Sequence, residues 1–266
     1  MTMTTIDASY YLENVLPQVS TQQRETFFTQ YPHIQFDSGQ SLQTVPIVML
    51  VALTGTGKST TLNLLSEMIP IDDKKIPSRR ALADMVIIPT AQTIAGDSVQ
   101  AVTDRVERFR YTGLFARHIS GGYVEAYHWL NLTHTTGDTL ICEGIRGHRE
   151  IDYALNHCPN WRIIELSANP LTRLQRLSQR SDAFDEAEGS VSLDFLPEHY
   201  RDRVQAELKH GTVSPQAITI MQAEAQNYGL IPYNTSHPNY KLIVTDNLSP
   251  DSVAQQVKEA IIAWQA

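Results

Sequence analysis

The fold of this chain is decided by residues 45–60, VPIVMLVALTGTGKST. Residues 45–53 form a continuous apolar run without alternation, which is typical of a buried strand in a parallel sheet whose two faces are covered by helices. The run leads directly into a glycine- and threonine-rich turn, and apolar residues at helical spacing follow the turn until Pro70. The sequence therefore predicts a strand, a loop and a helix in immediate succession.

The turn carries the motif Ala52-x-x-x-x-Gly57-Lys58-Ser59, the Walker A pattern of a P-loop with alanine at its first position. Glycines in such a loop allow successive backbone N–H groups to turn toward phosphate oxygens, and the following helix adds the positive end of its dipole. Lys58 is expected to bind the β- and γ-phosphates and Ser59 to ligate Mg²⁺. The residues predicted to bind the nucleoside triphosphate are Thr54, Gly55, Thr56, Gly57, Lys58, Ser59 and Thr60.

The motif is short, so a chance match in a turn is the alternative to a nucleotide site. The strand before it and the helix after it favour the nucleotide site. We therefore expect ATP with Mg²⁺ as the bound cofactor.

Composition limits the other partners. The chain has 266 residues and a formal net charge of −8, with 42% hydrophobic residues, enough for a buried core. An acidic protein is a poor general ligand for polyanions, so nucleic acid is not expected as a partner. The sequence has two cysteines without metal-ligand spacing, no apolar run long enough to span a membrane and no signal-peptide pattern. A cytoplasmic protein is expected, with a homodimer as one option for its oligomeric state.

Strands and helices alternate along the chain after residue 45, which indicates an α/β fold with a parallel sheet flanked by helices. Residues 1–44 are predicted to form an N-terminal helical extension and residues 45–266 the main domain. Further strands are expected at 139–144, 161–166 and 240–244. Helices are expected at 10–16, 20–31, 99–118, 124–132, 171–177, 198–209 and 252–264, and residues 181–192 are expected to form a loop.

Glu143 ends the predicted strand at 139–144. Open α/β sheets bind ligands at the carboxyl ends of their strands, so this acid is expected beside the loop of the motif. It can hold Mg²⁺ through water or accept a proton from an attacking hydroxyl. The alternative is a structural carboxylate that caps the next turn.

Several arginines are candidates for phosphate or substrate contacts. Arg173, Arg176 and Arg180 lie at i, i+3 and i+7, so a helix places them on one face, where they can stabilise the transferred phosphoryl group or simply face solvent. Arginine suits bidentate contacts with phosphate and carboxylate, although intrahelical ion pairs are an alternative role for some of these side chains. The predicted substrate-binding residues are Arg79, Arg80, Arg105 and Arg146.

The order of these features resembles the nucleoside-monophosphate kinases and the thymidylate and deoxynucleoside kinases. Residues 143–146, Glu-Gly-Ile-Arg, are similar to the Asp-Gly-Phe-Pro-Arg element of adenylate kinases, and residues 173–182 are similar to the lid of thymidylate and deoxynucleoside kinases. The resemblance spans about residues 45–185 and the C-terminal end. It implies a three-layer P-loop kinase-like fold, a helical insert at about 71–136 that holds the acceptor, and a lid at about 173–195 whose arginines close over the phosphates.

The sequence thus predicts a P-loop kinase that transfers a phosphoryl group from ATP to a small acceptor, such as a nucleotide or another phosphorylated metabolite. Its expected catalytic residues are Lys58, Glu143, Arg173, Arg176 and Arg180, with Ser59 and Glu143 at the metal. The alternative is a regulatory P-loop ATPase that hydrolyses ATP and acts on a protein partner. The identity of the acceptor does not follow from the sequence.

Overall fold

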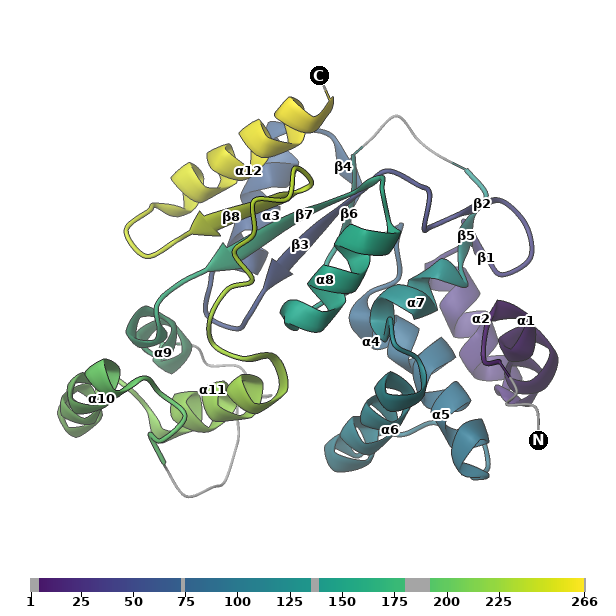
Figure 1. Cartoon of the computed structure of the whole chain (residues 1–266), viewed down its shortest axis with the longest axis horizontal. Coiled ribbons are helices and arrows are strands. Elements are labelled where there is room, and N and C mark those ends of the chain that lie inside the picture. Colours follow the sequence, from purple (N-terminus) through teal and green to yellow (C-terminus); the bar gives the residue numbers. More distant parts are fainter. Residues whose placement is uncertain (1–4, 73–74, 135–138, 180–191, 266) are drawn as a thin grey trace. The chain divides into compact units, whose positions relative to one another are not determined.

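A computed structural model of the chain describes residues 5–72, 75–134, 139–179 and 192–265, without the side chain of Arg105. Its main sheet has five strands in the order β4-β6-β3-β7-β8 (Figure 1). The strands are β3 (Ile47–Ala52), β4 (Ile71–Asp72), β6 (Thr139–Cys142), β7 (Trp161–Ser167) and β8 (Tyr240–Val244). The predicted α/β fold with a parallel sheet flanked by helices is confirmed.

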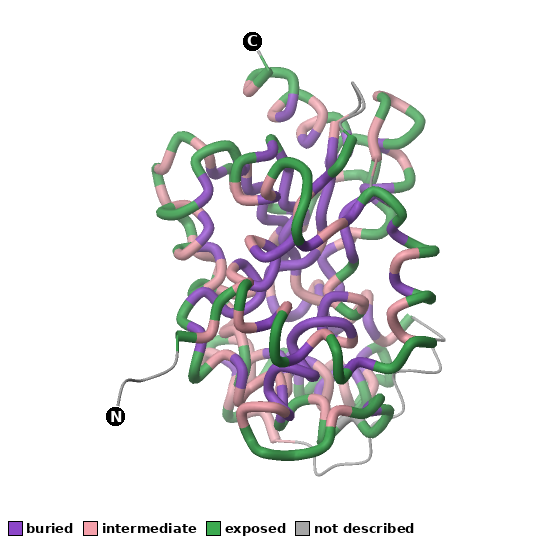
Figure 2. Tube along the Cα trace, turned by 90° about the vertical axis from the view of Figure 1, so that its right-hand side faces the viewer, coloured by how far each residue is buried: buried purple, intermediate pink, exposed green. Residues whose placement is uncertain are grey.

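The strands explain why the apolar runs of the sequence are continuous. All six residues of β3 are buried, because helices shield both faces of a parallel sheet. In β3 and β6 the pair Met49 and Cys142 lies in parallel register, and β7 runs parallel to β8 from Ile163 to Ser167. Figure 2 shows that buried and exposed stretches alternate along the chain.

Contacts between residues divide the chain into two compact units. Unit 1 comprises residues 1–49, 70–145 and 149–162, and unit 2 comprises residues 50–69, 146–148 and 163–266. The predicted division into residues 1–44 and 45–266 stays a prediction.

Unit 1 joins the N-terminal segment to the predicted helical insert. The hydroxyl of Tyr11 donates to the carbonyl of Met85 at 2.7 Å, and its ring packs beside Phe36. Three short strands, β1 (Ile34–Gln35), β2 (Gln40–Ser41) and β5 (Asn131–Leu132), form an antiparallel sheet in the order β1-β5-β2. The helical elements of the N-terminal segment are α1 (Ala8–Tyr10), η1 (Tyr11–Val15), η2 (Leu16–Gln18) and α2 (Thr21–Gln30).

Two helices of the insert differ from the sequence prediction. The helix expected at 99–118 is α6 (Arg105–His118), because the Asp104 side chain accepts from the N–H of Glu107 and caps the helix there. Two large apolar residues of α6, Val106 and Phe109, are 75% and 51% exposed. The helix expected at 124–132 is α7 (Tyr123–His128), which stops where the chain enters β5.

The remaining helices of the insert, α4 (Arg79–Leu82), η3 (Ala83–Ile87) and α5 (Ile88–Ala95), were not predicted. The mostly apolar stretch from Leu82 to Ile88 lacks a polar face to mark its helical period, which is why the pattern is hard to read. Helix α8 (Gly147–His157) follows β6.

Unit 2 contains α3 (Lys58–Met68), which packs against the C-terminal helix α12 (Pro250–Gln265). It also contains α9 (Pro170–Ser178), α10 (Glu198–His210) and α11 (Pro215–Tyr228), whose apolar faces form one core cluster that includes Leu174, Val204 and Ile218. Helix α11 lies in a stretch for which the sequence offered no interpretation. None of the helices in the described ranges is long and apolar enough to cross a membrane.

Candidate functional site

The β3–α3 loop, residues 53–57, connects the buried strand β3 to helix α3. Two of its residues need the left-handed backbone region that glycine adopts readily, because Gly55 has φ +87° and Gly57 has φ +96°. Gly55 is also constrained by space, since a Cβ atom there would lie 2.9 Å from the carbonyl oxygen of Arg173. Helix α3 begins at Lys58, directly after Gly57. The local order of strand, glycine-rich loop and helix agrees with the motif.

Side chains from elsewhere in unit 2 bind the loop carbonyls. Arg173 Nε donates to the Thr54 carbonyl at 2.9 Å, and Arg176 Nη1 donates to the Gly55 carbonyl at 3.3 Å. The Thr245 hydroxyl, at the end of β8, donates to the Thr56 carbonyl at 3.1 Å. Three consecutive carbonyls are thus held by side chains of α9 and of the residue after β8.

This arrangement determines where the loop N–H groups point. A trans peptide is planar, so the N–H of each residue points away from the carbonyl of the residue before it. Holding the carbonyls of Thr54 and Thr56 turns the N–H groups of Gly55 and Gly57 to the opposite side. The N–H of Thr56 is directed back to the Leu53 carbonyl at 3.4 Å.

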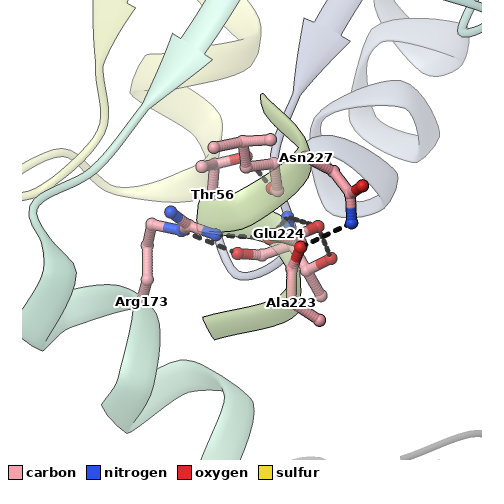
Figure 3. A network of polar contacts seen from close by, with 7 residues as sticks. Thr56, Arg173, Ala223, Glu224 and Asn227 are labelled. Atoms are coloured by element: carbon pink, nitrogen blue, oxygen red, sulfur yellow. Dashed lines mark hydrogen bonds and ion pairs between the residues drawn. The ribbon is translucent and has the colours of Figure 1, made fainter. Parts of the chain in front are cut away.

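Glu224 of α11 completes the contacts to the loop. Its carboxylate accepts from the N–H of Thr54 at 3.0 and 3.1 Å and from the Thr54 hydroxyl. The same carboxylate accepts from Arg173 Nη2 at 2.5 Å. Figure 3 shows Arg173 pointing from its helix toward Glu224, beside the loop.

The charged side chains of Arg173 and Glu224 are both largely buried. The side chains of Arg173 and Glu224 are 2% and 10% exposed. Burial lowers the pKa of Arg173, and the neighbouring Glu224 opposes that shift. An arginine remains charged in proteins, so the pair places two opposite buried charges next to the loop.

The remaining residues of the motif lie at the first turn of α3. Lys58 is half-buried, and Ser59 and Thr60 are exposed. An exposed hydroxyl at this turn fits the way Mg²⁺ is held at phosphate sites, where phosphates and water supply most of the ligands. In the part of the chain that the structure describes, no group of three His, Cys, Asp or Glu side chains could hold a metal by itself.

The β6–α8 loop, residues 143–146, lies after a neighbouring strand and carries Glu143, which is half-buried. Arg79, at the start of α4, donates to the Gly144 carbonyl at 2.7 Å and forms two hydrogen bonds with Glu150 at 2.7 and 3.0 Å. Its guanidinium also lies 3.4 Å from the centre of the Tyr123 ring. The substrate-binding role of Arg79 stays a prediction; in the structure its guanidinium contacts Gly144, Glu150 and Tyr123 inside unit 1.

The other predicted arginines that the structure describes differ in exposure. Arg80 is exposed on α4, and Arg146 is half-buried before α8. Arg180 and the expected loop at 181–192 lie outside the described residues, apart from Ser192, and so does the side chain of Arg105. Arg173 and Arg176 do lie on one face of α9, as their spacing predicted, and both reach the β3–α3 loop.

Sequence reasoning missed Glu224 and Thr245. Glu224 is buried three positions after the buried Met221, so it lies on the apolar face of α11 rather than on its solvent face. A single acid on an apolar helical face was the available signal, and it required the helix to be predicted first. Nothing in the sequence around Thr245 singles out its hydroxyl.

Comparison with known proteins gives distant likenesses. No protein-family model and no curated protein sequence matches the chain. Among solved structures, an unliganded sugar kinase from Janibacter sp. HTCC2649 is 13% identical, with 82% of this chain and 95% of that chain covered and a TM-score of 0.37. A protein from Chloroflexus aurantiacus j-10-fl, provisionally named as a kinase, is 15% identical, with 83% and 98% covered and a TM-score of 0.36. Likenesses this distant assign no family, so the function must be inferred from the chain's own residues.

Proposed function

We propose that this chain transfers a phosphoryl group from ATP to a small-molecule acceptor. The observation that carries the proposal is the β3–α3 loop, where the carbonyls of Thr54 and Thr56 are held, so that the N–H groups of Gly55 and Gly57 point away from Arg173 and Thr245, directly before the start of α3. Backbone N–H groups at a helix start bind anions, and the motif adds the Lys58 ammonium to them.

In this proposal each group of the nucleotide site has one role. The N–H groups and Lys58 bind the triphosphate, and the dipole of α3 adds partial positive charge. Ser59 would hold Mg²⁺, which when bound neutralises phosphate charge. Glu143 orients the acceptor or the metal. Phosphoryl transfer needs mainly positioning and charge stabilisation, so no further nucleophile of the protein is required.

The resemblance to nucleoside-monophosphate kinases adds finer proposals. The insert at about 71–136 would bind the acceptor, with Arg80 and Arg146 among its contacts. The segment at about 173–195 would act as the lid, with Arg180 as its phosphate contact. Arg176 is held by the Gly55 carbonyl and by Thr245, so it would act at the base of such a lid.

The test is ATP turnover with Mg²⁺, measured with and without a panel of nucleosides, nucleotides and sugar phosphates, while ADP and free phosphate are followed together. ADP release that rises with one acceptor while free phosphate stays low supports a kinase and identifies its substrate. Free phosphate equal to ADP with every acceptor would instead support the regulatory ATPase. The Lys58→Ala variant is the control for turnover by contaminating enzymes.

A further inference from the structure

Both backbone groups of one loop residue are bound by a single ion pair. The N–H of Thr54 donates to Glu224 and the carbonyl of Thr54 accepts from Arg173, while Arg173 and Glu224 bind each other. Glu224 lies 170 positions along the chain from Thr54, outside the motif. The geometry of the loop therefore depends on residues that belong to α9 and α11.

We propose that Arg173 and Glu224 are positioning residues of the nucleotide site. Their ion pair fixes the Thr54 peptide groups, and thereby the direction of the N–H groups that follow. The proposal rests on the proposed function, because it takes phosphate to bind at this loop. It also gives Arg173 a task different from that of a mobile lid residue.

The loop needs such support because its own hydrogen bonds, from the N–H and the hydroxyl of Thr56 to the Leu53 carbonyl, do not involve the Thr54 peptide groups. Glycine has wide backbone freedom, so the peptide planes around Gly55 and Gly57 can rotate unless a contact holds them. Buried hydrogen bonds to charged groups are stronger than neutral ones. A guanidinium can also bind the Thr54 carbonyl with Nε and Glu224 with Nη2 at the same time, because its donors lie in one rigid plane.

The pair also solves an electrostatic problem. A carboxylate next to a phosphate-binding loop would repel the nucleotide, and Arg173 compensates that charge. Removing only Arg173 would leave the Glu224 charge buried and unpaired, which harms both folding and phosphate binding. The effects of substituting Arg173 and Glu224 are therefore expected to depend on each other.

The test separates positioning from folding with a paired replacement. Arg173→Met combined with Glu224→Met removes both charges, keeps similar volume and leaves no buried charge unpaired. We expect this double variant to fold with a melting temperature near that of the wild type. We expect it to bind MgATP about ten- to a hundredfold more weakly, as judged by equilibrium titration.

A second double variant tests the hydrogen bond from the Thr54 N–H to Glu224. Arg173→Met with Glu224→Gln restores an acceptor oxygen for the Thr54 N–H, so part of the lost MgATP affinity should return. Amide hydrogen exchange at Thr54 should be faster in the Met/Met variant than in the wild type and intermediate in the Met/Gln variant. A purely structural role would not produce this order.

The matched control lies on the sheet of the same unit. Glu165 is also a buried acid, and it accepts from the Tyr240 hydroxyl and from the N–H of Tyr233. Glu165→Gln with Tyr240→Phe should leave MgATP affinity unchanged.

Unchanged MgATP affinity in a folded Met/Met variant would overturn the proposal. If the Met/Met variant does not fold, the Met/Gln variant and Glu224→Gln alone take its place in both measurements, and wild-type affinity in either overturns the proposal equally. If wild-type protein binds no MgATP, the proposed function fails, while Thr54 exchange still shows whether the pair holds the loop.

Discussion

Two loops that follow strands of the main sheet are held in a similar way. In unit 2, Arg173 binds the carbonyl of Thr54 and pairs with Glu224. In the β6–α8 loop of unit 1, Arg79 likewise binds a backbone carbonyl and pairs with a glutamate from a helix that lies further along the chain.

The two ion pairs differ in how far the arginine is buried and in which groups the glutamate binds. The arginine side chain is 2% exposed at the β3–α3 loop and 17% exposed at the β6–α8 loop. Glu224 also binds the N–H and the hydroxyl of its loop, whereas Glu150 is bonded twice to Arg79. At the β3–α3 loop the Thr54 N–H is thus bound as well as three carbonyls, which suits the proposed presentation of the Gly55 and Gly57 N–H groups. At the β6–α8 loop Arg79 binds the Gly144 carbonyl, directly after Glu143, whose side chain has a role in the proposed function.

The largest expected difference between the loops is catalytic. Lys58→Ala should reduce phosphoryl transfer about 10³-fold, because the triphosphate loses its main side-chain cation. Glu143→Gln should reduce the rate about 10²-fold while ATP affinity stays near that of the wild type, because only the acceptor or metal step uses its charge. Rate and ATP affinity are measured for both variants. Equal losses of rate and affinity in Glu143→Gln would contradict its assigned role.

Breaking the ion pairs one residue at a time should affect stability unequally. Arg173→Met leaves a buried carboxylate unpaired and should lower the free energy of unfolding by about 3 kcal/mol. Arg79→Met removes a guanidinium that is 17% exposed, against 2% for Arg173, and should lower the free energy of unfolding by about 1–2 kcal/mol. Urea denaturation of both variants measures the difference. A larger loss of unfolding free energy for Arg79→Met than for Arg173→Met would mean that the burial of the ion pair does not determine its contribution to stability.

Alanine substitutions at Gly144 and at Gly57 should destabilise the protein to different degrees. A Cβ at Gly144 would lie 1.9 Å from the Tyr127 hydroxyl oxygen, which itself is tied to the Pro77 carbonyl. Gly144→Ala should therefore lower the free energy of unfolding by about 2–3 kcal/mol through overpacking. A Cβ at Gly57 would meet no atom within 4 Å, so only the φ of +96° disfavours alanine there. Gly57→Ala should therefore lower the free energy of unfolding by about 1 kcal/mol.

The same pair distinguishes folding from nucleotide binding. Gly57→Ala should weaken MgATP binding despite its small effect on stability, because the φ of +96° disfavours alanine and a shifted backbone would redirect the N–H that the proposal assigns to phosphate. MgATP titration of both variants is the measurement. Wild-type affinity in Gly57→Ala would place the anion site elsewhere.

The smallest expected effect is a dependence on pH with opposite sign in the two units. The hydrogen bond with His128 lowers the pKa of Glu125 in unit 1, whereas burial raises the pKa of Glu165 in unit 2. The stability that Glu125 contributes is present above its ordinary pKa and is lost as pH falls through the lowered value. The penalty from ionised Glu165 is present above its raised pKa and is relieved as pH falls through that value.

Each carboxylate can be examined with its glutamine variant between pH 7 and pH 3. On acidification, the stability advantage of the wild type over Glu125→Gln should shrink, while the wild type should gain relative to Glu165→Gln. Each change should be about 1 kcal/mol or less. Changes of the same sign for both variants would contradict the assigned causes.

The sequence predicted the features of this protein that depend on neighbouring residues. The continuous apolar run identified β3, the glycines marked the loop and its left-handed backbone positions, and the spacing of Arg173 and Arg176 placed both on one face of α9. These features follow from backbone sterics and from periodicity, which act over a few positions along the chain.

The tertiary structure decided what those residues contact. The same spacing that placed Arg173 on a helical face left open whether it meets solvent, a nucleotide or the protein, and the fold directs it to Thr54 and Glu224. Likewise Arg79, which the sequence left available for a substrate, is bound to Gly144 and Glu150. An ion pair between residues so far apart in sequence forms only when packing brings their helices together, and no local pattern records that packing.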